Sequence, residues 1–145
     1  FFLVGSLSVG WHHPGAQQVS LAVDIAESSH LSTLLITTTG RKSGKPRTKP
    51  IWFVYADDRL YLQSGKNGET DWYRNLQKTP ALKLKIGELI LSGVATFVED
   101  EAEIERVHSW FRAKYTYARV AGLIGASIGH GKVVIVEKLT VSARE

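Results

Sequence analysis

The highest density of side chains that could do chemistry lies in residues 41–49. Five of these nine residues are Arg or Lys and none is Asp or Glu, so their charges repel one another unless an anion lies nearby. Gly40 and Gly44 let the backbone turn its N–H groups toward an oxyanion, and Arg47 offers a planar fork for phosphate. The segment therefore suits a bound phosphate. The same composition also fits a solvated hairpin tip or a nucleic-acid-binding arm, and spacing alone does not separate the three.

A second loop of interest follows at residues 64–68, with the sequence Ser-Gly-Lys-Asn-Gly. Its two glycines permit close backbone contact with a ligand, and Lys66 supplies another cation. The N-terminus of the helix expected next would favour negative charge. An ordinary turn has the same composition, so this loop alone does not define a site.

Strands are expected on both sides of the basic run. Residues 34–38 are apolar or β-branched and lead into it, and residues 47–55 form the strand that leaves it. Asp57 and Asp58 make a turn, after which residues 60–64 return as the partner strand of a hairpin.

The rest of the chain predicts two helices and three further strands. Thr70 is expected to cap a short helix through Gln77, and Asp100 with Glu103 to cap a longer amphipathic one. Alternation of apolar and polar residues predicts strands at residues 82–86 and 89–98, and residues 132–141 form a last one. Six strands without a β-α-β pattern indicate a mainly β (α+β) fold, an antiparallel sheet that is most economically a small barrel with flanking helices.

We expect one domain overall. Residues 1–33 are interpreted as an N-terminal arm in which residues 19–29 form a short helix, and residues 34–145 as the barrel. A hydrophobic fraction of 43% with 22% charged residues is typical of a globular protein. The absence of methionine, with Phe1 as the first residue, leads us to expect that residues are missing from the chain as given.

Composition limits the possible chemistry. With no cysteine, the chain has no disulfide, zinc knuckle or Cys nucleophile, and its five scattered histidines form no metal-binding motif. The net charge of +4 favours an anionic partner, whether nucleic acid, a membrane surface or a phosphorylated small molecule. No apolar run approaches the roughly 20 residues that span a bilayer, so a cytoplasmic protein is expected.

Residues 37–50, 64–68 and 72–76, followed by Pro80, together resemble the deazaflavin (F420)-dependent nitroreductase family of flavin-reductase-like split β-barrels, relatives of the pyridoxamine 5′-phosphate oxidases. The resemblance implies a split β-barrel oxidoreductase that passes a hydride from reduced coenzyme F420 to a quinone, nitro compound or activated alkene. FMN is the alternative cofactor, because residues 50–53 and the short loop after Ser64 are also similar to FMN-using relatives.

The same resemblance assigns roles to residues. It implies that Lys42, Ser43 and Arg47 hold the cofactor phosphate, and it places Tyr115 and Tyr117 on the substrate side as candidate catalytic residues. The alternative for the two tyrosines is that they close the long helix onto the core. The complete expected cofactor set is Lys42, Ser43, Arg47, Lys49, Pro50, Gln63, Ser64, Lys66, Trp72 and Asn75.

The expected partners are a phosphorylated flavin-type cofactor and a small hydrophobic electron acceptor, with no nucleic acid. A homodimer is expected because Trp52, Phe53, Trp110 and Phe111 provide more aromatic surface than one small core readily hides. The rival class is a non-enzymatic module, either a split barrel that sequesters flavin or haem or a DNA-binding domain that uses the basic loop.

Overall fold

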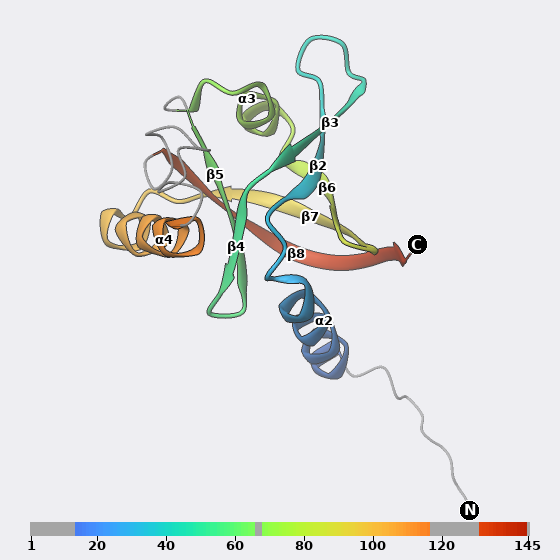
Figure 1. Cartoon of the computed structure of the whole chain (residues 1–145). Coiled ribbons are helices and arrows are strands. Elements are labelled where there is room, and N and C mark those ends of the chain that lie inside the picture. Colours follow the sequence, from blue (N-terminus) through green and yellow to red (C-terminus); the bar gives the residue numbers. More distant parts are fainter. Residues whose placement is uncertain (1–13, 66–67, 117–130, 145) are drawn as a thin grey trace, which may run out of the picture.

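The computed structural model describes residues 14–65, 68–116 and 131–144 (Figure 1). Within these ranges lie helices α2 (Pro14–Ser28), α3 (Asp71–Lys78) and α4 (Glu101–Lys114) and a seven-stranded sheet. Every pair of neighbouring strands is antiparallel, in the order β3-β2-β6-β7-β8-β5-β4. The strands are β2 (Leu34–Thr39), β3 (Pro46–Ile51), β4 (Phe53–Ala56), β5 (Arg59–Ser64), β6 (Ala81–Ile86), β7 (Leu89–Phe97) and β8 (Lys132–Arg144).

The two edges of this sheet belong to one stretch of chain. β3 pairs with β2 at one edge, β4 pairs with β5 at the other, and only Trp52 separates β3 from β4. A sheet whose first and last strands are joined in this way must curl toward closure. The predicted antiparallel barrel is therefore confirmed, but the single strand expected at residues 47–55 is wrong, because it divides at Trp52 as it changes partner.

Local sequence explains the hairpins. Asp57 and Asp58 adopt φ of 53° and 58°, the left-handed conformation required at both central positions of a type I′ turn, which Asp tolerates better than most residues. This turn connects β4 to β5 and confirms the expected hairpin. In β6, Leu82, Leu84 and Ile86 are buried whereas Lys83 is exposed, the alternation of a strand with one face in the core.

Two packed clusters cover opposite faces of the central strands. Along β8, Val134 and Val136 belong to the larger cluster with α2 and α3, whereas Val133 and Ile135 belong to the smaller cluster under α4. Burial on both faces explains the uninterrupted apolar run at residues 133–136. Ile25 of α2 is 2% exposed and lies in the larger cluster, so the N-terminal helix packs as part of the barrel.

The helix ends differ from the expectations in two places. Asp100 accepts the Glu103 N–H at 2.9 Å and caps α4 as predicted. Thr70 stands at the N-cap position of α3, but its side chain does not cap the helix; its Oγ1 lies 2.6 Å from Ser64 Oγ. Helix α2 begins at Pro14, earlier than expected, and proline is well suited to a first turn because it needs no N–H partner there.

The end of α4 fixes the point where β3 becomes β4. The Tyr115 hydroxyl accepts the Phe53 N–H at 3.1 Å and donates to the Ser32 carbonyl at 2.8 Å. Lys114 Nζ donates to the Phe53 carbonyl at 2.8 Å and lies 3.7 Å from the centroid of the Phe53 ring. Trp52 stacks on Tyr115 with the ring centroids 5.1 Å apart. The strand therefore changes partner where α4 binds its backbone.

Burial of the Lys114 amine and the Tyr115 hydroxyl predicts opposite pH dependences of the free energy of unfolding. Burial lowers the pKa of Lys114 from 10.5 to about 8, so the folded state prefers the neutral amine and its contribution to stability grows as pH rises from about 8 to 10.5. Burial raises the pKa of Tyr115 from 10.0 to about 12, so its contribution is complete below pH 10 and is lost between 10 and 12.

A Lys114→Met variant tests the lysine part of this prediction. In urea unfolding, the stability of the unmodified protein should rise relative to that of Lys114→Met between about pH 8 and 10. A difference between the two proteins that stays constant over this range would contradict the expected titration of Lys114.

None of the three described helices has both the length and the apolar character needed to cross a lipid bilayer.

Candidate cofactor site

A pocket of about 420 Å³ opens between the loop after β2, strand β3 and helix α3. In Figure 1 the β2–β3 hairpin and α3 lie together at one end of the molecule, with α2 at the other end. The pocket is lined by Thr38, Gly40, Arg41, Lys42, Ser43, Arg47, Thr48, Lys49, Asp71, Trp72 and Asn75.

The basic loop is a closed turn. Gly40 N–H donates to the Lys45 carbonyl and Gly44 N–H to the Gly40 carbonyl, both at 2.8 Å. Gly44 has a φ of 72°, which favours glycine, and a Cβ on Gly40 would lie 2.6 Å from Ser43 Oγ. The Ser43 hydroxyl accepts the Lys45 N–H at 3.1 Å, which leaves its own hydrogen for another acceptor. Both glycines therefore serve the turn that the sequence predicted.

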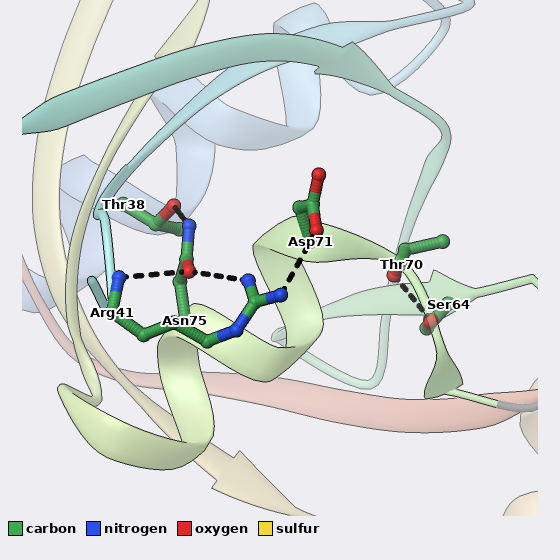
Figure 2. Close-up of polar contacts among 6 residues, drawn as sticks. All are labelled: Thr38, Arg41, Ser64, Thr70, Asp71 and Asn75. Carbon is green, nitrogen blue, oxygen red and sulfur yellow. Dashed lines mark hydrogen bonds and ion pairs between the residues drawn. The ribbon is translucent and has the colours of Figure 1, made fainter. Parts of the chain in front are cut away.

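Helix α3 holds this loop through side chains more than 30 residues away in the sequence (Figure 2). Asn75 Oδ1 accepts the backbone N–H of Arg41 at 3.1 Å and its guanidinium at 3.0 Å, and Asn75 Nδ2 donates to Thr38 Oγ1 at 3.1 Å. Lys78 Nζ donates to the Arg41 carbonyl at 2.7 Å. Because Asn75 is only 3% exposed, its own hydrogen bonds are at least partly shielded from water and fix the loop against the helix.

The charge in the pocket suits an anion. Among the described residues, its lining contains four cations and three hydroxyl side chains, against the single carboxylate of Asp71. Arginine can bind phosphate with two parallel hydrogen bonds, and lysine and serine can complete its coordination. Trp72 adds an apolar wall that is 5% exposed. This donor set fits the phosphate of a flavin-type cofactor with an aromatic surface beside it.

Six of the residues expected to bind the cofactor come together in this pocket, namely Lys42, Ser43, Arg47, Lys49, Trp72 and Asn75. Asn75 lines the pocket, but its side-chain amide is occupied by hydrogen bonds to Arg41 and Thr38. Lys66 lies outside the described residues.

Three other expected residues do not line the pocket. Pro50 is exposed on β3, and Gln63 and Ser64 lie on β5. Ser64 is fully buried, and its hydroxyl contacts Thr70 Oγ1 at 2.6 Å and the Gly65 carbonyl at 3.0 Å. The strand directs this hydroxyl into the interior, where its contact with Thr70 fixes the approach to α3.

Tyr115, expected on the substrate side, packs against the core at the end of α4. Its side chain is 6% exposed, and its hydroxyl is used by the backbone of Phe53 and Ser32. The helix turns this side chain toward Phe111, with ring centroids 6.1 Å apart, because both residues belong to its apolar stripe. The position favours the alternative interpretation, closure of the helix onto the core. Tyr117 lies outside the described residues.

Two charged pocket residues, Arg41 and Asp71, were missing from the expected set. Arg41 belonged to the basic run but carried no assigned role, and Asp71 is the first residue of α3. Their charges were visible in the sequence, but their contact at 3.2 Å depends on the packing of α3 against the loop. The described residues contain no group of three His, Cys, Asp or Glu side chains placed to hold a metal ion.

The curled antiparallel sheet, with a cationic pocket beside α3, is the architecture of a split β-barrel protein. Residues 17–128 match the model of the F420H(2)-dependent quinone reductase family, and the chain belongs to this family. The family and fold that the sequence motifs predicted are therefore confirmed.

Individual relatives agree with this assignment. An F420H(2)-dependent quinone reductase of Mycobacterium tuberculosis is 31% identical over 58 residues, a match that spans 38% of this chain and 39% of that relative. The solved structure of an F420-H2 dependent reductase is 29% identical, with a TM-score of 0.55 over 73% of this chain and 94% of the other. A structure described as a domain-swapped dimer is 25% identical, with a TM-score of 0.56 over 86% of this chain and all of the other.

Proposed function

We propose that this chain is an oxidoreductase that binds coenzyme F420 in the pocket beside α3 and transfers a hydride from it to a quinone. The observation that carries the proposal is the pocket itself, which gathers the cations of the loop and of β3 against Trp72. The names of the family and of its reductase relatives support F420 as the cofactor and a quinone as the acceptor.

The lining residues would contact different parts of the cofactor, according to their positions in the pocket. Lys42, Ser43 and Arg47 would hold the phosphate, with Lys49 adding charge from β3. Trp72 would orient the ring system and keep water from one side of it. When bound, reduced F420 would supply the hydride, and a proton from solvent would complete reduction of the quinone to the hydroquinone. The protein's contribution is thus binding and orientation.

Parallel titrations with F420 and FMN test the cofactor. We expect saturable binding of F420, weaker binding of FMN, and oxidation of reduced F420 when menadione is added as the quinone. Stronger binding of FMN, together with turnover of menadione by the FMN-loaded protein, would move the assignment to the alternative cofactor. Saturable binding of neither would overturn the proposal.

The second acceptor class, nitro compounds and activated alkenes, is tested in the same assay. Because the pocket donors address the cofactor phosphate and leave the acceptor unspecified, we propose that these compounds are reduced at the same site. Turnover should then be abolished together with quinone reduction in any variant that loses the cofactor. A variant that loses only one of the two activities would show separate sites.

We also propose that the protein is a homodimer. The domain-swapped dimer among the solved structures supports this, as does the exposed edge strand β3, whose residues 46–50 are all exposed. Light scattering at micromolar concentration should give about twice the 16.1 kDa mass of the chain. A mass equal to that of one chain would contradict the dimer.

A further inference from the structure

Arg41 makes two hydrogen bonds through its backbone and two through its guanidinium, and these contacts differ in strength. Its backbone is fixed on both sides, by Asn75 at the N–H and by Lys78 at the carbonyl. One end of its guanidinium, Nη1, donates to the same Asn75 oxygen, which is shielded from water. The other end, Nη2, contacts Asp71 Oδ1 at 3.2 Å (Figure 2).

Of the hydrogen bonds that Arg41 makes, its ion pair with Asp71 is the weakest. The Asp71 side chain is 77% exposed and that of Arg41 is 26% exposed, and a single exposed ion pair contributes little to stability because water and salt screen it. A phosphate offers more negative charge and can take two hydrogen bonds from one guanidinium. Both side chains line the pocket, so a bound anion would compete with Asp71 for Arg41 Nη2.

The position of Asp71 is favourable for helix α3 but unfavourable for the binding of an anion in the pocket. As the first residue of α3 it interacts favourably with the helix dipole, yet among the described residues that line this cationic pocket it is the only carboxylate. Any anion entering the pocket is repelled by this carboxylate and competes with it for Arg41. The residue therefore raises the threshold for anion binding.

We propose that Asp71 is a placeholder for the anionic group of the cofactor: it pairs with Arg41 until the cofactor's phosphate binds and replaces it. Arg41 keeps its bond to Asn75 throughout and exchanges only the Asp71 contact. The inference rests on the proposed function, because it needs an anionic cofactor in this pocket. It assigns Asp71 the role of setting the affinity for the anionic group, because that group must displace Asp71 from Arg41 to bind.

Binding constants of four proteins test the proposal: the unmodified protein, Asp71→Asn, Arg41→Gln and the double variant. Fluorescence titration at low salt should show that Asp71→Asn binds F420 about 3- to 10-fold more tightly, since the competing charge is gone. In the Arg41→Gln background the same change should alter the dissociation constant by less than about 2-fold. The non-additivity identifies Arg41 as the residue through which Asp71 acts.

Two controls separate this role from a general charge effect. Glu69→Gln removes a neighbouring exposed carboxylate that does not line the pocket, and it should change the dissociation constant by less than about 2-fold. The deazaflavin lacking its phosphate arm should bind Asp71→Asn and the unmodified protein equally. The melting temperature of the unliganded protein should change by less than about 2 °C in Asp71→Asn.

The outcomes that overturn the proposal are distinct from failure of the proposed function. If the unmodified protein binds F420 but Asp71→Asn binds it no more tightly, the placeholder role is wrong. Equal tightening with and without Arg41 would likewise reject it and leave Asp71 as a general charge. If the unmodified protein and all variants fail to bind F420, the proposed function fails, and the placeholder role fails with it.

Discussion

Replacing Arg47 by alanine is expected to weaken the binding of F420 by about 10- to 150-fold, the equivalent of the 1.5–3 kcal/mol typical of hydrogen bonds to charged groups. Arg47 lies on β3 directly opposite Thr38, and its side chain lines the pocket. Strand pairing holds the backbone of Arg47 in register, so the side chain projects from a fixed point. Fluorescence titration with F420 measures the loss.

Lys45→Ala is the matched control for Arg47→Ala. It removes the same charge from the same segment, but Lys45 does not line the pocket, so its dissociation constant should change by less than about 3-fold. Arg47→Lys keeps the charge and loses the planar fork, and its affinity should fall between the two. Equal affinities of Arg47→Ala and Lys45→Ala would show that the segment acts only through its net charge.

Tyr115→Phe is expected to destabilise the protein by about 1–3 kcal/mol, because the Phe53 N–H and the Ser32 carbonyl would lose their shared partner. For a chain of this size the melting temperature should fall by roughly 3 to 10 °C. The value of kcat/KM for quinone reduction, measured per folded molecule, should stay within about 2-fold, because the hydroxyl is turned into the interior.

Tyr55→Phe provides the comparison, since it removes a phenol hydroxyl from a half-buried position on β4 that lies apart from the pocket. Its melting temperature should fall by less than that of Tyr115→Phe. If Tyr115→Phe instead melts normally and loses kcat/KM by more than about 5-fold, the tyrosine acts on substrate after all.

Local patterns in the sequence predicted the parts of the fold that depend on neighbouring residues. The Asp57–Asp58 turn, the alternation around Leu84 and the Asp100 cap each involve residues close in the chain, so their signals are complete within a few positions. The division of β3 from β4 at Trp52 was not predictable in this way. It depends on Tyr115, which lies more than 60 residues along the chain.

For the pocket, too, local sequence patterns were informative and contacts between distant residues were not predictable. Residue types and motif order located the basic loop and the short helix, and they identified six of the lining residues. The motifs did not reveal which side chains face the ligand and which face the protein. Ser64 and Asn75 carry the polar groups expected of cofactor ligands. In the structure the Ser64 hydroxyl points into the interior, and the Asn75 amide binds the basic loop.

The central position of β8 determines when the barrel can form during synthesis. β8 lies between β7 and β5, and the β4–β5 hairpin joins the rest of the sheet through it, with pairs such as Leu60 with Val136 far apart in sequence. Until residues 132–144 have left the ribosome, β5 and β7 both present unpaired edges, which are sites of aggregation in nascent chains. Folding of this barrel is therefore expected to be completed only after β8, its last described strand, has left the ribosome.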